Sequence, residues 1–179
     1  MRSMRKEWNG KEIETFMLDM IASAPYERLE RKFTMSVWHA IYRRDIIENW
    51  IVRFRSEREV LSEDFPFQMD CLGHSDRVVY IPQAFYHYCL NESSLTHTFN
   101  SQKFMKVKAL YDLLAKQLEN VSKAQERLDR FYIGYMRSRT LELLSSAENE
   151  KKAILEKTLK DDFWEVLRKR YPSRWLPLY

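Results

Sequence analysis

Two adjacent carboxylates, Glu63 and Asp64, stand where a polar stretch gives way to the apolar run 65–67. Ser62, directly before them, is a favourable helix N-cap, so the pair is expected in the first turn of a helix. There the exposed backbone amides and the helix dipole favour negative charge. A carboxylate kept ionised in this way can accept a proton as a general base. The alternative is a solvent-exposed pair that only caps the helix.

The segments around this pair follow a definite order. The aromatic and basic segment VWHAIYRRD occupies 37–45, the acidic pair follows, and a Tyr-x-Tyr element at 86–88 precedes the polar loop NESSLT at 91–96. In this order, the stretch from Val37 to about Thr98 resembles the second half of family 2 glycosyltransferases, the bacterial type that builds surface polysaccharides. The resemblance covers roughly a third of the chain, and it depends on the order of the segments more than on any single motif.

The resemblance implies an inverting enzyme of the GT-A type, which moves a sugar from a nucleotide-sugar donor to a glycan or lipid-linked acceptor. Asp64 would be the base that takes the proton of the acceptor hydroxyl, and Glu63 would be its neighbour and orienting group. The resemblance also implies a divalent metal, magnesium or manganese, in the full-length enzyme, where a positive centre helps the diphosphate to leave.

The resemblance assigns six further side chains to the site. They are Trp38, His39, Tyr42 and Arg43 at the acceptor and donor sugars, and His87 and His97 near the diphosphate. Each type also has a simpler explanation. A tryptophan beside an apolar helix usually packs in a core, an arginine on a helix usually faces solvent, and a lone histidine is usually structural.

The nucleotide-binding half of such an enzyme is not recognisable in this sequence, which has no Asp-x-Asp strand and no alternation of strands and helices before residue 33. We therefore expect the C-terminal portion of a transferase, either a fragment or a truncated product, that is inactive alone. No metal site is predicted in this chain. The spacings among Cys71, His74, His87 and Cys89 are too loose for structural zinc.

The elements that must position these residues are mostly helical. Apolar periodicity predicts a helix from about Lys11 to Ala24, ended by Pro25, and a second from Ala40 to Trp50. Short extended segments are expected at 34–38 and 51–54.

The acidic pair heads the next predicted helix, which Gly73 ends. Residues 77–81 and 84–90 then read as two strands of a β-hairpin. From about Ser101, apolar side chains at helical spacing predict three or four helices. The predicted fold is mainly α with a small β-hairpin, an α+β arrangement in which 1–98 form the acceptor-side half of a GT-A-like domain and 99–179 a helical region.

The composition sets wide limits. The 179 residues carry a formal net charge of +4 and an isoelectric point of about 9.0. This mild bias suits an anionic ligand such as a nucleotide diphosphate, but the basic residues are too dispersed for a nucleic-acid binder. Two cysteines, no signal peptide and no apolar stretch of about 20 residues predict a cytoplasmic protein.

The alternative function is a helical interaction module. The basic and aromatic tail at 168–175 could contact a partner protein or the inner face of a membrane peripherally. Aromatic side chains exceed what a small core needs, which predicts an exposed apolar surface. Either a homodimer or the chain's own helix at 11–24 would cover that surface.

Overall fold

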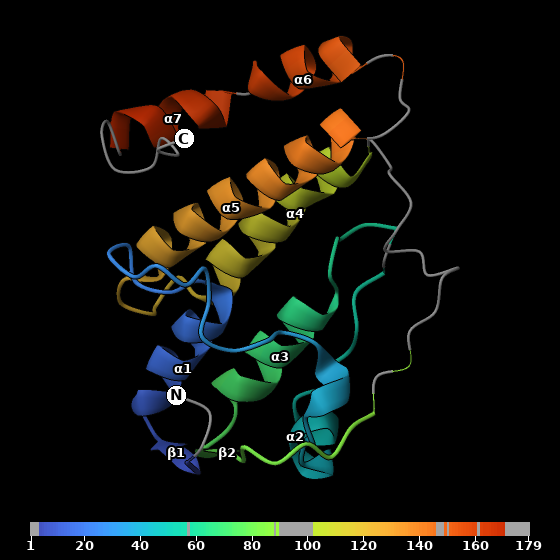
Figure 1. The fold of residues 1–179 in the computed structure, drawn as a ribbon. Helices are drawn as coiled ribbons and strands as arrows, with labels where there is room; N and C mark the ends of the chain where they lie inside the picture. Colours follow the sequence, from blue (N-terminus) through green and yellow to red (C-terminus); the bar gives the residue numbers. More distant parts are fainter. Residues whose placement is uncertain are drawn as a thin grey trace.

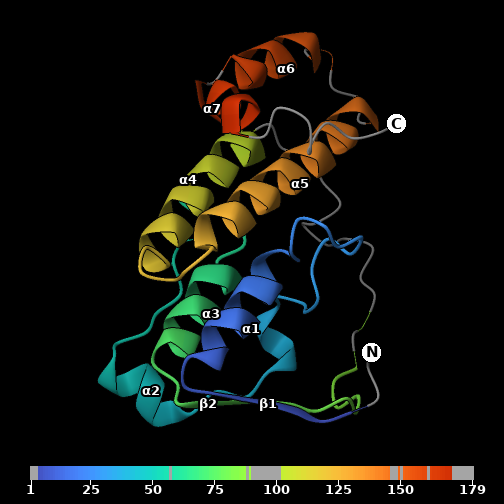
Figure 2. The same cartoon turned by 90° about the vertical axis from the view of Figure 1, so that its left-hand side faces the viewer.

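The computed structural model describes residues 4–56, 58–87, 89, 102–145, 149, 151–160 and 162–170. Its elements are β1 (Lys6–Asn9), α1 (Glu12–Ile21), the 3-10 turn η1 (Val37–His39), α2 (Arg44–Asn49), α3 (Asp64–Gly73), β2 (Arg77–Tyr80), α4 (Gln102–Gln117), α5 (Ala124–Ser145), α6 (Lys151–Leu159) and α7 (Asp162–Arg170). The described fold is mainly helical with one small antiparallel sheet, which confirms the predicted class at this level. The elements lie in layers: the sheet, then α1 and α3, then the α4–α5 pair, then α6 and α7 (Figures 1 and 2).

The small sheet joins the start of the chain to the strand after α3. β1 pairs with β2 in antiparallel register, with Trp8 opposite Val78. The predicted hairpin is therefore wrong, because the described residues of 84–90 form no strand. The ring of Trp8 anchors β1 in an aromatic group, with centroid distances of 4.7 Å to Phe16 and 5.6 Å to Phe33. A local turn signal marks a chain reversal, whereas burial of apolar side chains decides which strands pair.

One hydrophobic core joins the N-terminal part to the C-terminal helices. α1 packs on α3 and α5, and α3 packs on α4. The predicted helix at 11–24 is present as α1, but it ends at Ile21 because the chain is already extended at Ala22, ahead of Pro25. α1 thus covers the apolar face of α3 within this chain. The core includes Ile13, Met17, Ile21, Phe65, Met69, Leu110, Leu114, Leu128, Phe131 and Tyr132.

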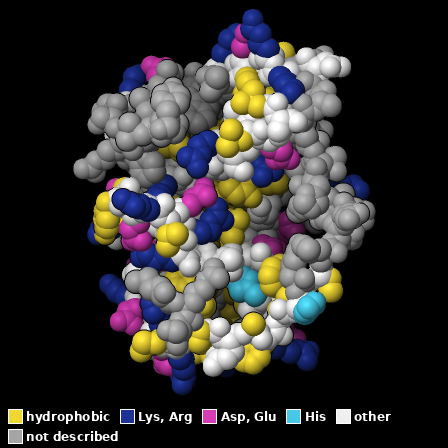
Figure 3. Space-filling view, viewed as in Figure 1, with side chains coloured by type: hydrophobic (Ala, Val, Ile, Leu, Met, Phe, Trp, Pro, Cys, Tyr) yellow, Lys and Arg dark blue, Asp and Glu magenta, His cyan; other side chains and the backbone are white. Residues whose placement is uncertain are grey.

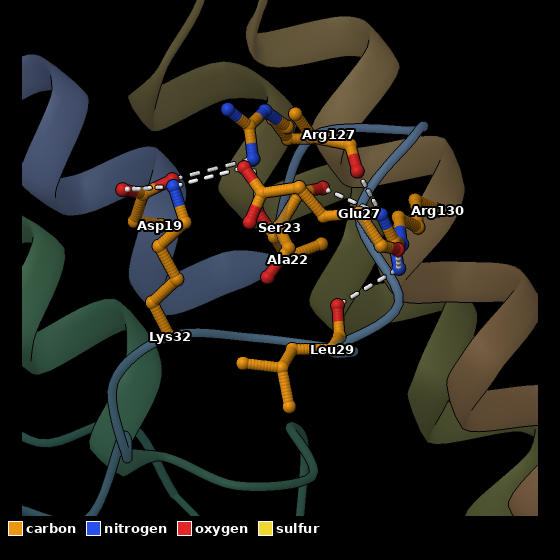
Figure 4. Close-up of polar contacts among 9 residues, drawn as sticks. Asp19, Ala22, Ser23, Glu27, Leu29, Lys32, Arg127 and Arg130 are labelled. Atoms are coloured by element: carbon orange, nitrogen blue, oxygen red, sulfur yellow. Dashed lines mark hydrogen bonds and ion pairs between the residues drawn. The ribbon is translucent and has the colours of Figure 1, made fainter. Parts of the chain in front are cut away.

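Two arginines of α5 hold the loop that follows α1 (Figure 4). Arg127 donates to the carbonyl of Ala22 at 2.6 Å and pairs with Asp19. Arg130 donates to four backbone carbonyls, those of Ser23, Ala24, Glu27 and Leu29. A guanidinium group offers five N–H donors, so it can satisfy the polar backbone of an irregular loop. The path of the chain towards η1 is fixed in this way.

The segment between α1 and α3 is less regular than predicted. The helix expected over 40–50 is reduced to α2, the segment at 34–38 leads into η1, and the strand expected at 51–54 is absent. Ile51 has a φ of 52° and turns the chain directly after α2. Phe54 then stacks on Phe67 with ring centroids 4.1 Å apart. Packing on α3 has here overridden a local preference for strand.

Candidate functional site around Asp64

Asp64 is the first residue of α3 and is half-buried. The predicted cap is wrong: Glu63 holds the N-cap position, with no capping bond from its side chain. Ser62 instead has a left-handed backbone, with a φ of 56°. Its hydroxyl lies 2.6 Å from the hydroxyl of Tyr135 on α5. The charge of Asp64 nevertheless lies at the helix start, where the helix dipole favours negative charge.

Asp64 and Gln68, one helical turn apart, both bind the segment that leads into η1. The N–H of Val37 donates to Asp64 Oδ2 at 3.2 Å. The side-chain amide of Gln68, which is 3% exposed, donates to the carbonyl of Met35. Residues at i and i+4 share a helix face, so one face of α3 holds two backbone groups of this segment. The aromatic segment at 37–45 is therefore docked on the start of α3.

η1 carries two predicted site residues close to Asp64. The ring of Trp38 lies 4.4 Å from that of Tyr86, and the two side chains are 45% and 52% exposed. His39 Nε2 lies 3.1 Å from the hydroxyl of Thr34. Burial lowers the pKa of His39, while the charge of Asp64 and the bond to Thr34 oppose that shift. Tyr86 belongs to the Tyr-x-Tyr element, but its pairing with Trp38 could not be read from the sequence.

Tyr42 belongs to a second, smaller apolar cluster. Its ring meets that of Phe67 edge to face at 5.3 Å, close to the buried side chains of Val52 and Cys71. Its hydroxyl is buried and has no hydrogen-bond partner among the described residues. Burial raises the pKa of this hydroxyl, with smaller contributions from Cys71 and Asp64. The structure thus places Tyr42 in a packed position behind the start of α3.

Arg43 lies in a different pocket. It forms an ion pair with Asp45 and lines a pocket of about 510 Å³. Trp50 and His74 also line this pocket, and their rings stack 3.9 Å apart. None of the side chains gathered around Asp64 lines it. The predicted contact of Arg43 with the same sugar site is therefore not supported by its position.

The remaining predicted side chains differ in how well they are placed. Glu63 is half-buried directly before Asp64, and His87 is exposed after Tyr86. His97 lies outside the described residues. Figure 3, in the orientation of Figure 1, shows a hollow near the middle of this face, with acidic and hydrophobic side chains inside and a histidine below it.

The described residues offer no fitting ligand set for the metal that the resemblance implies. No group of three or more His, Cys, Asp and Glu side chains among them could hold a metal ion. Cys71 is buried, and burial raises the pKa of its thiol to about 11, which disfavours the thiolate that binds metals. Separately, no helix in the described part of the chain is both long and apolar enough to span a bilayer.

Comparison with known proteins adds no relative to this picture. No family model, no curated protein and no solved structure matches the chain. The site itself is a carboxylate at a helix start that binds a turn with exposed aromatic rings.

Proposed function

We propose that the Asp64 region is the acceptor side of a glycosyl-transfer site, and that this chain forms the C-terminal part of an inverting transferase of the family 2, GT-A type. One observation supports this most directly. The carboxylate of Asp64 binds the turn that carries Trp38, whose ring pairs with Tyr86 in an exposed position. Three segments that are distant in the sequence meet at this point, and they are the segments on which the family resemblance rests.

Asp64 would act as the general base. Its Oδ2 accepts the Val37 N–H, and among the described residues none donates a hydrogen bond to Oδ1. That oxygen can receive the proton of an acceptor hydroxyl while the acceptor oxygen bonds to the anomeric carbon of the donor sugar. The bond from that carbon to the nucleoside diphosphate breaks, and its electron pair leaves with the diphosphate. The groups that bind the donor are not assigned to this chain.

Trp38 and Tyr86 would bind a sugar ring of the acceptor. A pyranose has an apolar face of C–H groups, which packs on an aromatic ring and removes apolar area from water. His39 lies beside this pair and, because its pKa is lowered, carries a neutral ring near pH 7. A neutral imidazole can both donate and accept hydrogen bonds, as a sugar hydroxyl requires.

The matched pair Trp38→Ala and Trp50→Ala tests sugar binding directly. Both tryptophans are about half exposed, but Trp50 lies in the other pocket and stacks on His74. We expect saturation-transfer NMR with a panel of bacterial oligosaccharides to give signals that Trp38→Ala abolishes and Trp50→Ala preserves. Asp64→Asn should leave binding largely intact. Absence of any transfer signal, or equal loss in both tryptophan variants, would contradict the proposal.

An interaction module remains the second candidate, because several large apolar side chains are exposed. Ile41 is 101% exposed and Phe85 is 80% exposed. The predicted membrane contact of the basic tail is less supported: Lys169 pairs with Glu165, and 171–179 lie outside the described residues. A monomeric mass in light scattering, without binding of an apolar dye, would count against the module and against the predicted homodimer.

A further inference from the structure

We infer that Tyr135 on α5 is a positioning residue for Asp64, an inference that rests on the proposed role of Asp64 as the base. The hydroxyls of Tyr135 and Ser62 are 2.6 Å apart, although 73 positions separate the two residues. Ser62 lies two residues before Asp64 and begins the turn into α3. Among the described residues, this is the only hydroxyl contact between α5 and the turn. It falls on Ser62, whose backbone sets the direction in which α3 starts.

The backbone of Ser62 needs such a contact. Its φ of 56° lies in the left-handed region, which is uncommon for a residue with a side chain. Its carbonyl accepts the N–H of Phe65 at 3.0 Å, so it also closes the first turn of α3. A change in this φ would rotate the turn and swing Asp64 away from Val37. Uncommon backbone conformations persist where surrounding contacts hold them.

Tyr135 is well held and can act as a fixed support. Its ring lies 5.0 Å from the ring of Phe131, and the guanidinium of Arg139 lies 5.7 Å from its centroid. Phe131 also meets Phe65 at 5.3 Å. α5 thus touches the start of α3 twice, through an apolar contact at Phe65 and a polar contact at Ser62. The apolar contact would survive Tyr135→Phe, so this variant isolates the contribution of the hydroxyl.

The Val37 amide reports the position of Asp64 without any substrate, because it donates to the carboxylate. Loss of one hydrogen bond typically weakens a local structure enough to change its opening about two- to tenfold. We expect hydrogen exchange of the Val37 amide to accelerate by that factor in Tyr135→Phe. Asp64→Asn should move the same amide resonance, which calibrates the probe. The control Tyr26→Phe removes the hydroxyl of a side chain that is 88% exposed. It should change neither the exchange rate nor the resonance position of the Val37 amide.

The pairing is tested by combining substitutions. In a Ser62→Gly background the left-handed backbone is tolerated and the hydroxyl partner is gone. Tyr135→Phe should then have no further effect on the Val37 amide. Equal effects of Tyr135→Phe with and without the serine hydroxyl would overturn the inference, and so would an unchanged Val37 amide in the single variant.

Transfer assays separate positioning from a general loss of stability. In the active protein that carries this chain, Tyr135→Phe should lower kcat severalfold and leave KM for the acceptor nearly unchanged. A rise in KM with constant kcat would contradict the inference. If Asp64→Asn keeps full turnover while Tyr135→Phe still changes the Val37 amide, the proposed function fails and the structural coupling stands. The reverse result, with an inactive Asp64→Asn and a silent Tyr135→Phe, rejects only the coupling.

Discussion

Two aspartates of this chain are held in opposite ways. Asp129, in the interior of α5, is 0% exposed and accepts bonds from Tyr111 at 2.7 Å, from Gln125 at 2.8 Å and from Arg170. Asp64, at the start of α3, is half-buried and has one hydrogen-bond partner among the described residues, the N–H of Val37. Both oxygens of Asp129 accept hydrogen bonds, whereas only Oδ2 of Asp64 accepts one from the described residues.

The difference separates a structural charge from a reactive one. Asp129 joins α4, α5 and α7 through Tyr111, Gln125 and Arg170, and a buried carboxylate needs such partners to remain charged. Asp64 holds only the edge of the η1 segment and lies next to exposed aromatic rings. A carboxylate used as a base must reach its substrate, so an unfilled oxygen at an open surface fits that role. The following variants test this contrast.

The largest effect is expected from Asp64→Asn in a transfer assay of the full-length protein. Removal of a general base typically lowers the rate by a factor of about 10² to 10⁴. Because Asp64 has a single described partner, the free energy of unfolding should fall by only about 1 kcal/mol. Transfer kinetics and urea unfolding of the same variant measure both quantities. Turnover close to wild type would show that Asp64 is not the base.

Asp129→Ala should have the opposite profile. The substitution removes the acceptor Asp129 from the buried Tyr111 hydroxyl and the charged partner from Arg170, so we expect the free energy of unfolding to fall by about 3 kcal/mol. Asp112→Ala, at an exposed carboxylate that pairs with Lys108, is the control and should change stability by less than about 0.5 kcal/mol. Similar losses in urea unfolding for both variants would contradict the structural role of Asp129.

The network at Asp129 also predicts a loss of stability at alkaline pH. Burial, and then the hydrogen bond with Asp129, raise the pKa of Tyr111 from 10.0 to about 12. The unfolded chain therefore loses this proton first, and stability should fall as pH rises from about 10 to 12, by up to about 2 kcal/mol. Tyr111→Phe should remove this part of the pH dependence. An unchanged slope in that variant would exclude Tyr111 as its source.

The smallest expected effect is a loss of folding stability at acidic pH, caused by His39 beside Asp64. Burial lowers the pKa of His39 below 6.5, so the folded state holds this ring neutral where the unfolded chain binds a proton. Its contribution is complete above about pH 6.5 and is lost as pH falls towards the lowered value. His39→Gln should flatten this part of the stability curve. If the variant lost stability more steeply than wild type as pH falls, the predicted contribution of His39 would be contradicted.

Local patterns predicted the helices well where a helix buries a continuous apolar face. Val107, Leu110 and Leu114 recur at helical spacing on α4, and all three are buried. Helical periodicity depends on few neighbours in the sequence, so it survives without knowledge of the fold. The strands were predicted less well. β2 was expected to pair with the segment after it, and it pairs with β1 because Trp8 brings that strand into an aromatic group.

The grouping of side chains around Asp64 was predicted in part. The sequence singled out Trp38, His39 and Asp64, and the structure brings these three together. The sequence also suggested Arg43, which lies in another pocket. A segment motif shows which residues are neighbours in the chain, but it does not show to which side each side chain points. The enzymatic role of all these residues stays a prediction.

The sequence by itself determined the helical class, the presence of several helices after about Ser101, and the acidic pair at the start of α3, because propensity and periodicity act over a few residues. Only the tertiary structure decided how Asp64 is held. The N–H of Val37 reaches it from 27 residues away, and Tyr135 supports Ser62 from 73 residues away. Such contacts depend on how α3 and α5 pack, which no local pattern encodes.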